Sequence, residues 1–473
     1  MPRLRLALAY AALCAVLSTA TAPGASASHT QATFFEAPAQ LLNPVTRPRA
    51  MAALKTLGVT ALRVELNWHA VAPSPNARKR PSFDATNPAS YAWGQYDPLI
   101  AEAHSLGWKV LLTVTAPVPR WAQANTASRS LVYRPNSRQF GQLMTAVGRH
   151  FGSEVSLYGI WNEPNHHEFL EPQFNSNGSP ASPKIYRGLY QAGYAGLQAA
   201  GIANPSVLIG ETAPEGQAYL RPPVRVQQNV GPLVFLRETL CLNGRYRRSN
   251  SCAALPAAGY AVHPYPSAAG PLSVPFNGES VTIASLSRMS RALDLAAGAG
   301  AITAHLPIYI TEFGIMSKPN RYQGVAASVQ AEYDAISERI AYSNPRVASF
   351  AQYLLKDDPT PGKHSHAVGF QTGLEYFNGA HKPSFAGFPI PLTVSRAGSG
   401  YFLWGFVRPA GGATTVTVEV QPRGSHRFKM LAQVATNSLG YWTLTSFMQG
   451  SHWRVRWVSP GGTRYAGPSV HAY

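Results

Sequence analysis

Residues 47–66 read RPRAMAALKTLGVTALRVEL, a helix-like segment that ends at Gly58 and is followed by a strand-like run. Glycine terminates helices readily, because it adopts the required backbone conformation without steric cost. Residues 96–114, YDPLIAEAHSLGWKVLLTV, repeat this order with Gly107 at the junction. Strands that alternate with helices in this way are typical of βα units around a parallel sheet.

Eight such units can be placed between residues 28 and 388, and they predict a (β/α)8 barrel with enlarged loops. The expected strands are 33–36, 61–66, 109–114, 155–161, 207–210, 259–263, 307–311 and 347–353. The expected helices include 47–57, 96–106, 137–151, 183–200, 283–297 and 326–341.

Residues 389–473 follow a different pattern. The segments VTVEV (416–420) and WRVRW (453–457) alternate with a period of two, which predicts a small antiparallel β-sandwich. This region holds eight Lys and Arg residues against one acid, Glu419, so it is strongly basic. Its four tryptophans could form a sugar-binding surface, although their alternation favours the core: Trp404, Trp442, Trp453 and Trp457.

The N-terminus has the pattern of a secretory signal peptide. A basic start (Arg3, Arg5) precedes an apolar, uncharged run over 6–19, and a small-residue cleavage site follows at 25–27. We therefore expect residues 1–27 to be removed and the mature protein to be secreted. No later stretch is long and apolar enough to predict a transmembrane segment.

Two cysteines remain after this cleavage, Cys241 and Cys252. An even number in an oxidising compartment predicts a disulfide, with two unpaired thiols as the alternative. The formal net charge of +18 favours an anionic partner such as an acidic cell-wall polymer, although an arginine-rich coding bias would also explain it. No nucleic-acid-binding module is evident, so a specific nucleic-acid partner is not expected. The sequence does not indicate the oligomeric state.

Two of the expected strands end in a carboxylate. Residues 160–165 read IWNEPN around Glu163, and residues 309–314 read YITEFG around Glu312. Catalytic residues of a (β/α)8 barrel lie at the carboxyl ends of its strands. A pair of carboxyl groups there is what cleavage of a glycosidic bond requires, since one protonates the leaving oxygen and the other attacks or activates water.

The two motifs together, 149 residues apart, resemble those of the clan A glycoside hydrolases, which include the cellulase-like family 5 and the xylosidase- and iduronidase-like family 39. The resemblance covers the whole barrel. It implies a retaining mechanism with Glu163 as acid/base and Glu312 as nucleophile, and it requires no cofactor. It also implies that Asn162 hydrogen-bonds the sugar 2-hydroxyl.

The resemblance extends to further substrate-binding candidates. It implies that Arg63 steadies the charge of the nucleophile, with Glu65 as a possible partner of this arginine, and that Tyr265 hydrogen-bonds the nucleophile beside His263. Ordinary core or salt-bridged residues are the alternative. Trp68, Trp121 and Tyr353 follow strands and are expected either as sugar-stacking walls of the site or as core residues. Many family members have Trp where this chain has Tyr353.

Other chemistries lack their motifs. The sequence has no H-E-x-x-H, G-x-S-x-G or G-x-G-x-x-G pattern, so neither a metal nor a nucleotide cofactor is expected. Glu211, after the fifth expected strand, is a rival carboxylate without the Asn-Glu-Pro context. The alternative function is a weak or inactive barrel that binds carbohydrate or cell wall. The sugar, the linkage and the choice between exo and endo action are not predicted.

Overall fold

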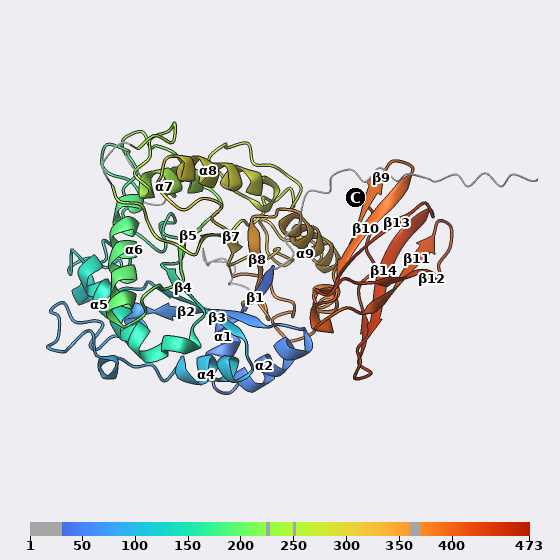
Figure 1. The fold of residues 1–473 in the computed structure, drawn as a ribbon, viewed down its shortest axis with the longest axis horizontal. Helices are drawn as coiled ribbons and strands as arrows, with labels where there is room; N and C mark the ends of the chain where they lie inside the picture. The colour runs from blue at the N-terminus through green and yellow to red at the C-terminus, as the bar shows by residue number, and fades with distance from the viewer. Residues whose placement is uncertain (1–30, 224–227, 249–251, 360–368) are drawn as a thin grey trace, which may run out of the picture.

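A computed structural model describes residues 31–223, 228–248, 252–359 and 369–473. Eight parallel strands close into a barrel in chain order, which confirms the fold predicted from the alternating elements (Figure 1). The strands are β1 (Ala32–Glu36), β2 (Ala61–Asn67), β3 (Lys109–Thr115), β4 (Leu157–Ile160), β5 (Val207–Thr212), β6 (Gly259–Val262), β7 (Ile308–Ile310) and β8 (Val347–Tyr353). The predicted signal peptide lies outside the described residues.

Helices surround the barrel on its outer side (Figure 1). They are α1 (Pro38–Leu41), α2 (Arg47–Thr56), α3 (Trp68–Val71), α4 (Asp97–Ser105), α5 (Ser137–Phe151), α6 (Ser182–Ala199), α7 (Pro232–Thr239), α8 (Leu286–Gly298), α9 (Ala327–Tyr342) and α10 (Pro383–Gly387). Among the described residues, no helix is long and apolar enough to cross a membrane.

One strand is shorter than expected for a reason that concerns the site. The fourth strand was expected to include Trp161, but Trp161 adopts a φ of 72° and ends the extended backbone one residue earlier. Glu163 and Glu211 also have positive φ values, 37° and 51°. Non-glycine residues rarely adopt this conformation, and such strain gathers at functional sites. The strained residues lie where β4 and β5 end.

The C-terminal region forms two antiparallel sheets packed around one core. The first has the order β13-β10-β9 and the second the order β12-β11-β14-β15. Their strands are β9 (Leu392–Ala397), β10 (Gly400–Phe406), β11 (Thr415–Pro422), β12 (Lys429–Ala435), β13 (Tyr441–Ser446), β14 (Gly450–Val458) and β15 (Arg464–Ala466). All four tryptophans of this region are buried, so they belong to the core as their alternation indicated.

The sandwich packs beside α9 of the barrel (Figure 1). Arg408, which is 8% exposed, donates two hydrogen bonds to Glu338 of α9 at 3.0 and 2.9 Å. The guanidinium also lies over the Phe388 ring, 4.0 Å from its centroid. Close approach extends to Gly58, where an added Cβ would lie 2.7 Å from the Pro409 nitrogen. The glycine that ends α2 therefore also makes room for the second domain.

Cys241 and Cys252 form a disulfide with a Cα–Cα distance of 6.3 Å, as predicted. The bond closes a loop that follows α7.

Candidate active site

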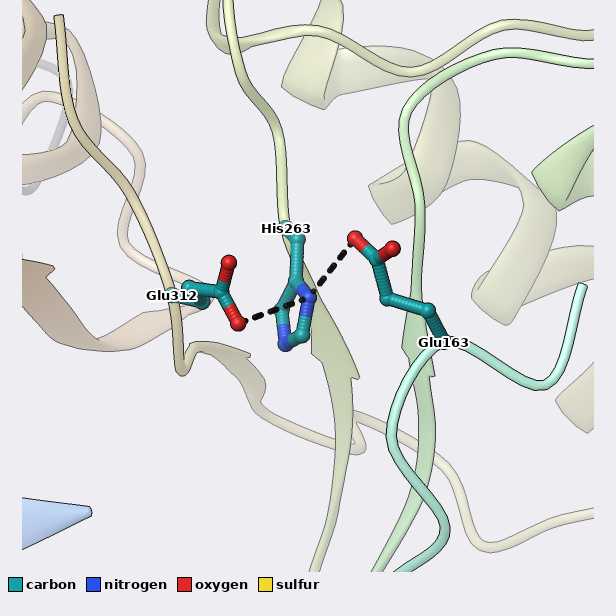
Figure 2. Close-up of side chains that lie close together, drawn as sticks. All are labelled: Glu163, His263 and Glu312. Atoms are coloured by element: carbon teal, nitrogen blue, oxygen red, sulfur yellow. Dashed lines mark hydrogen bonds and ion pairs between the residues drawn. The ribbon is translucent and has the colours of Figure 1, made fainter. Parts of the chain in front are cut away.

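The two predicted catalytic glutamates face each other at one end of the barrel, with His263 between them (Figure 2). Glu163 follows β4, His263 follows β6 and Glu312 follows β7. An oxygen of Glu163, a ring nitrogen of His263 and an oxygen of Glu312 all lie within 4.8 Å of one another. The barrel therefore brings together two carboxyl groups that are 149 residues apart in the chain.

His263 contacts both glutamates through Nδ1, at 3.1 Å from Glu163 Oε1 and 3.6 Å from Glu312 Oε2. Its Nε2 lies 3.1 Å from the Thr311 hydroxyl. Burial, and secondly the charge of Arg63, lower the pKa of His263 well below its ordinary value. The ring is therefore neutral at neutral pH. With its proton on Nδ1, it donates toward the glutamates and accepts the Thr311 hydrogen bond.

Arg63, at 0% side-chain exposure, is the positive centre of the site. Its terminal nitrogens contact four carboxylates, at 2.6 Å from Glu36, 3.1 Å from Glu65, 2.6 Å from Glu211 and 3.0 Å from Glu312. The predicted partner Glu65 is thus one of four. Arg63 also donates to Asn162 Oδ1 at 2.7 Å, which orients the side chain next to the acid/base candidate.

Glu36 is a charged residue of the site that was not predicted from the sequence. It is the last residue of β1, is 2% exposed and shares the Nη1 group of Arg63 with Glu312. The sequence did contain an indication of this residue. The first expected strand ends at a glutamate, and the fourth and seventh expected strands are each followed closely by one.

The rival carboxylate Glu211 lies beneath the site and does not line its cavity. It is 1% exposed and accepts hydrogen bonds from Arg63 at 2.6 Å and from the Thr113 hydroxyl at 2.7 Å. Gly159 in β4 makes space for it, since a Cβ there would lie 2.1 Å from Glu211 Oε1. Glu211 therefore holds Arg63 in place from below.

The two facing glutamates differ in their surroundings. Burial, and secondly repulsion from Glu312, raise the pKa of Glu163 well above its ordinary value. Burial raises the pKa of Glu312 to about 7, against the opposing effects of Arg63 and of the Tyr265 hydroxyl. That hydroxyl donates to Glu312 Oε1 at 2.7 Å. Since hydrogen bonds and a nearby cation favour the ionised form, Glu312 ionises before Glu163.

A cavity of about 650 Å³ opens above this pair. Of the predicted site residues, it is lined by Asn162, Glu163, Tyr265, Glu312 and Tyr353. Arg63 and His263 lie beneath it as supports. Aromatic rings that the sequence reasoning did not single out, Phe169 and Phe370, also line the cavity.

Trp68 and Trp121 were expected either as walls of the site or as core residues, and the structure places both in the barrel's outer core. They are 0% and 5% exposed, and their rings pack edge to face with centroids 6.2 Å apart. Trp68 opens α3 and also packs against Phe140 of α5. The turn into α3 directs its ring away from the cavity, so neither ring is available to stack on a sugar.

Three side chains of the site also have the spacing of a possible metal site. Glu163, His263 and Glu312 offer oxygen and nitrogen atoms at a spacing that could ligate an ion. Arg63, however, already contacts Glu312 at 3.0 Å, and its positive charge opposes a cation at the same carboxylate. The arrangement suits acid–base and nucleophilic chemistry, which needs one protonated and one ionised carboxyl group.

No family model matches the sequence, and a search of curated proteins finds no match. Among solved structures, a glucosidase from Croceicoccus marinus superposes with a TM-score of 0.53 and 12% identity, over 90% of this chain and 94% of that one. A β-glucosidase from Pyrococcus furiosus has a TM-score of 0.45 and 16% identity, over 74% of this chain and 83% of its own. A β-glucuronidase from Bacteroides uniformis has a TM-score of 0.45 and 10% identity, over 94% of this chain and 46% of its own.

At such identities the likeness shows the fold alone. The chain has a closed (β/α)8 barrel followed by a small all-β region, and the glucosidase from Croceicoccus marinus shares this fold. The same barrel carries the facing glutamates at the carboxyl ends of β4 and β7, where this fold places its catalytic residues.

Proposed function

We propose that the protein is a secreted, retaining glycoside hydrolase that cleaves O-glycosidic bonds of a poly- or oligosaccharide. The observation that carries the proposal is the facing pair Glu163 and Glu312, with an oxygen of each within 4.8 Å at the floor of an open cavity. Carboxyl groups about 5 Å apart suit direct attack on the sugar, whereas inverting enzymes need roughly 6.5–9.5 Å to admit a water.

In this mechanism Glu312 attacks the anomeric carbon while Glu163 gives its proton to the leaving oxygen. The glycosyl–Glu312 ester forms as the glycosidic C–O bond breaks. Glu163, now ionised, then removes a proton from water, and the water oxygen displaces Glu312. Arg63 and Tyr265 hold the attacking carboxylate at 3.0 and 2.7 Å, and Asn162, which lines the cavity, would hydrogen-bond the sugar 2-hydroxyl.

The first test is hydrolysis of a panel of aryl β-glycosides, with product configuration followed by NMR. We expect retention, and a loss of roughly 10⁴-fold or more in Glu312→Ala. Azide should rescue this variant as the inverted glycosyl azide, and should rescue Glu163→Ala as the retained one. Glu102→Gln, a change on α4 outside the cavity lining, is the control. Near wild-type activity in Glu312→Ala, or an inverted wild-type product, would overturn the proposal.

Silence over the whole panel, with binding to polysaccharide retained, would instead favour the carbohydrate-binding alternative. We also expect activity to be unchanged after dialysis against a chelator, because the proposed steps use only side-chain carboxyl groups. Activity that is lost on chelation and restored by a divalent cation would contradict this expectation.

We further propose that the sandwich anchors the secreted enzyme to an anionic wall polymer. Arg423, Arg427 and Lys429 are exposed around the β11–β12 hairpin, and no described acidic residue pairs with them. Replacing all three with Gln should reduce co-sedimentation with a phosphate-rich wall fraction without changing hydrolysis of soluble glycosides. Unchanged co-sedimentation would refute the anchor.

N-terminal sequencing of protein from the culture medium, expected to begin near Ser28, tests secretion.

A further inference from the structure

The cavity is acidic although the chain as a whole is basic. Five carboxylate side chains line it, and among its described lining residues there is no Lys or Arg: Glu65, Glu163, Glu168, Glu215 and Glu312. Two of these are the proposed catalytic pair. Of the other three, Glu65 lies in β2, and Glu168 and Glu215 lie in the loops after β4 and β5, so separate segments contribute the same sign of charge.

We propose that the cavity binds a sugar that carries a free ammonium group, so that the substrate is an amino sugar with an unacetylated nitrogen. This inference rests on the proposed glycoside hydrolase function and names its substrate class. Ammonium groups donate short, charge-assisted hydrogen bonds to carboxylates, and a sugar carboxylate would be repelled by the same surface.

The described residues in and directly beneath the cavity offer no cation that is free to bind an acidic sugar. Arg63 is completely buried, and its terminal nitrogens are already engaged by four carboxylates and Asn162. His166 lines the cavity, but burial lowers its pKa to about 4, so the ring is neutral at neutral pH.

Glu65 is the carboxylate best placed to meet an ammonium group. Its side chain is 22% exposed, and Oε1 accepts a hydrogen bond from Arg63 at 3.1 Å. No hydrogen bond from a described residue reaches Oε2. The Glu65 charge also raises the pKa of both Glu163 and Glu312, which disfavours the ionised nucleophile. A ligand cation beside Glu65 would offset this repulsion and favour the reactive state of Glu312.

The basic sandwich does not cancel the local charge. Screening in physiological salt confines electrostatic effects to about 8 Å, so the cavity responds to its own lining. Non-specific attraction to a protein with a formal charge of +18 would favour anionic sugars. A preference for the cationic sugar therefore has to come from a local acidic site.

The experiment uses Glu163→Gln, which keeps the cavity but cannot protonate a leaving group. Calorimetry at pH 6 compares tetramers of glucosamine and of galactosamine with their N-acetylated counterparts, which share length and linkage. We expect at least one ammonium form to bind about tenfold or more tightly than its acetylated partner, with the gain falling as salt rises. Adding Glu65→Gln or Glu215→Gln should reduce the gain, and adding Glu102→Gln on α4 should not.

The inference is overturned if no pair shows an ammonium-dependent gain, whether the sugars bind equally or not at all. It is also overturned if Glu65→Gln and Glu215→Gln leave the gain unchanged. Its failure is distinguishable from failure of the proposed function. A wild-type enzyme that hydrolyses neutral or acetylated glycosides without ammonium preference refutes only the substrate class. An ammonium preference in a protein that hydrolyses no glycoside refutes only the enzyme.

Discussion

At the scale of single residues, the two glutamates should produce a bell-shaped dependence of kcat/KM on pH. Burial raises the pKa of Glu312 to about 7, so the rate should fall below this pH as the attacking carboxylate becomes protonated. The rate should fall again at higher pH, as Glu163 loses the proton that it must donate. A pH series with an aryl glycoside measures both limbs.

Glu163→Gln provides the matched test. With a leaving group acidic enough to depart without protonation, this variant should lose the alkaline limb and keep the acidic one. An alkaline limb that persists in Glu163→Gln would belong to another group, and Glu163 would not be the acid that protonates the leaving oxygen.

Tyr265→Phe removes the hydroxyl that donates to Glu312 Oε1 at 2.7 Å. A hydrogen bond to a charged group contributes about 1.5–3 kcal/mol, so kcat/KM should fall between about 10-fold and 160-fold. The pKa of Glu312 should rise, because the lost bond favoured its ionised form, and the acidic limb should move to higher pH. Tyr158→Phe, whose ring is buried away from the cavity, should leave the limb in place.

At the scale of elements, close packing around β4 requires a glycine at position 159. A Cβ on Gly159 would lie 2.1 Å from Glu211 Oε1 and 2.4 Å from Thr113 Oγ1. Gly159→Ala should therefore displace Glu211 from Arg63, cost about 1–3 kcal/mol in the free energy of unfolding and lower activity. Denaturant unfolding and kinetics measure the two effects.

The matched control is Gly188→Ala on α6, where the nearest atom to an added Cβ is at 3.8 Å. Alanine favours a helix more than glycine does, so this change should be neutral or stabilising by up to about 1 kcal/mol. If Gly159→Ala behaved like Gly188→Ala, the close packing of β4 against Glu211 would be refuted.

Some features of the elements could be predicted from the sequence and others could not. The barrel followed from the alternation of strands and helices, and the two motifs predicted that Glu163 and Glu312 lie where strands end. The sequence did not predict whether an aromatic side chain that follows a strand points into the cavity or into the core. Trp68 turns into α3 and packs on Trp121, while Phe169 and Phe370 reach the cavity from long loops. Loop conformation depends on contacts between distant segments, which period and spacing do not encode.

At the scale of the whole molecule, one buried ion pair joins the two domains. Arg408→Met would leave Glu338 buried without its partner, which costs about 3–5 kcal/mol. We expect a lower midpoint of thermal or urea unfolding, with the pair Arg408→Met and Glu338→Met recovering much of the loss. Arg396→Met, at an exposed position, should change stability by no more than about 0.5 kcal/mol. Equal effects of Arg408→Met and Arg396→Met would show that this contact does not stabilise the protein.

The number of cysteines favoured a disulfide but left two free thiols open, and the structure decided for the disulfide. By itself, the sequence determined the (β/α)8 barrel, the sandwich after it and the two glutamates at strand ends. These depend on local periodicity and on short motifs, which a single chain displays directly. Only the tertiary structure decided that Glu36, Glu65, Glu211 and Glu312 share one arginine, that Trp68 and Trp121 lie in the core, and that the cavity of a basic protein is acidic. The reason is physical: closing the barrel brings together the ends of eight strands, and the charge around each group is set by neighbours from other strands.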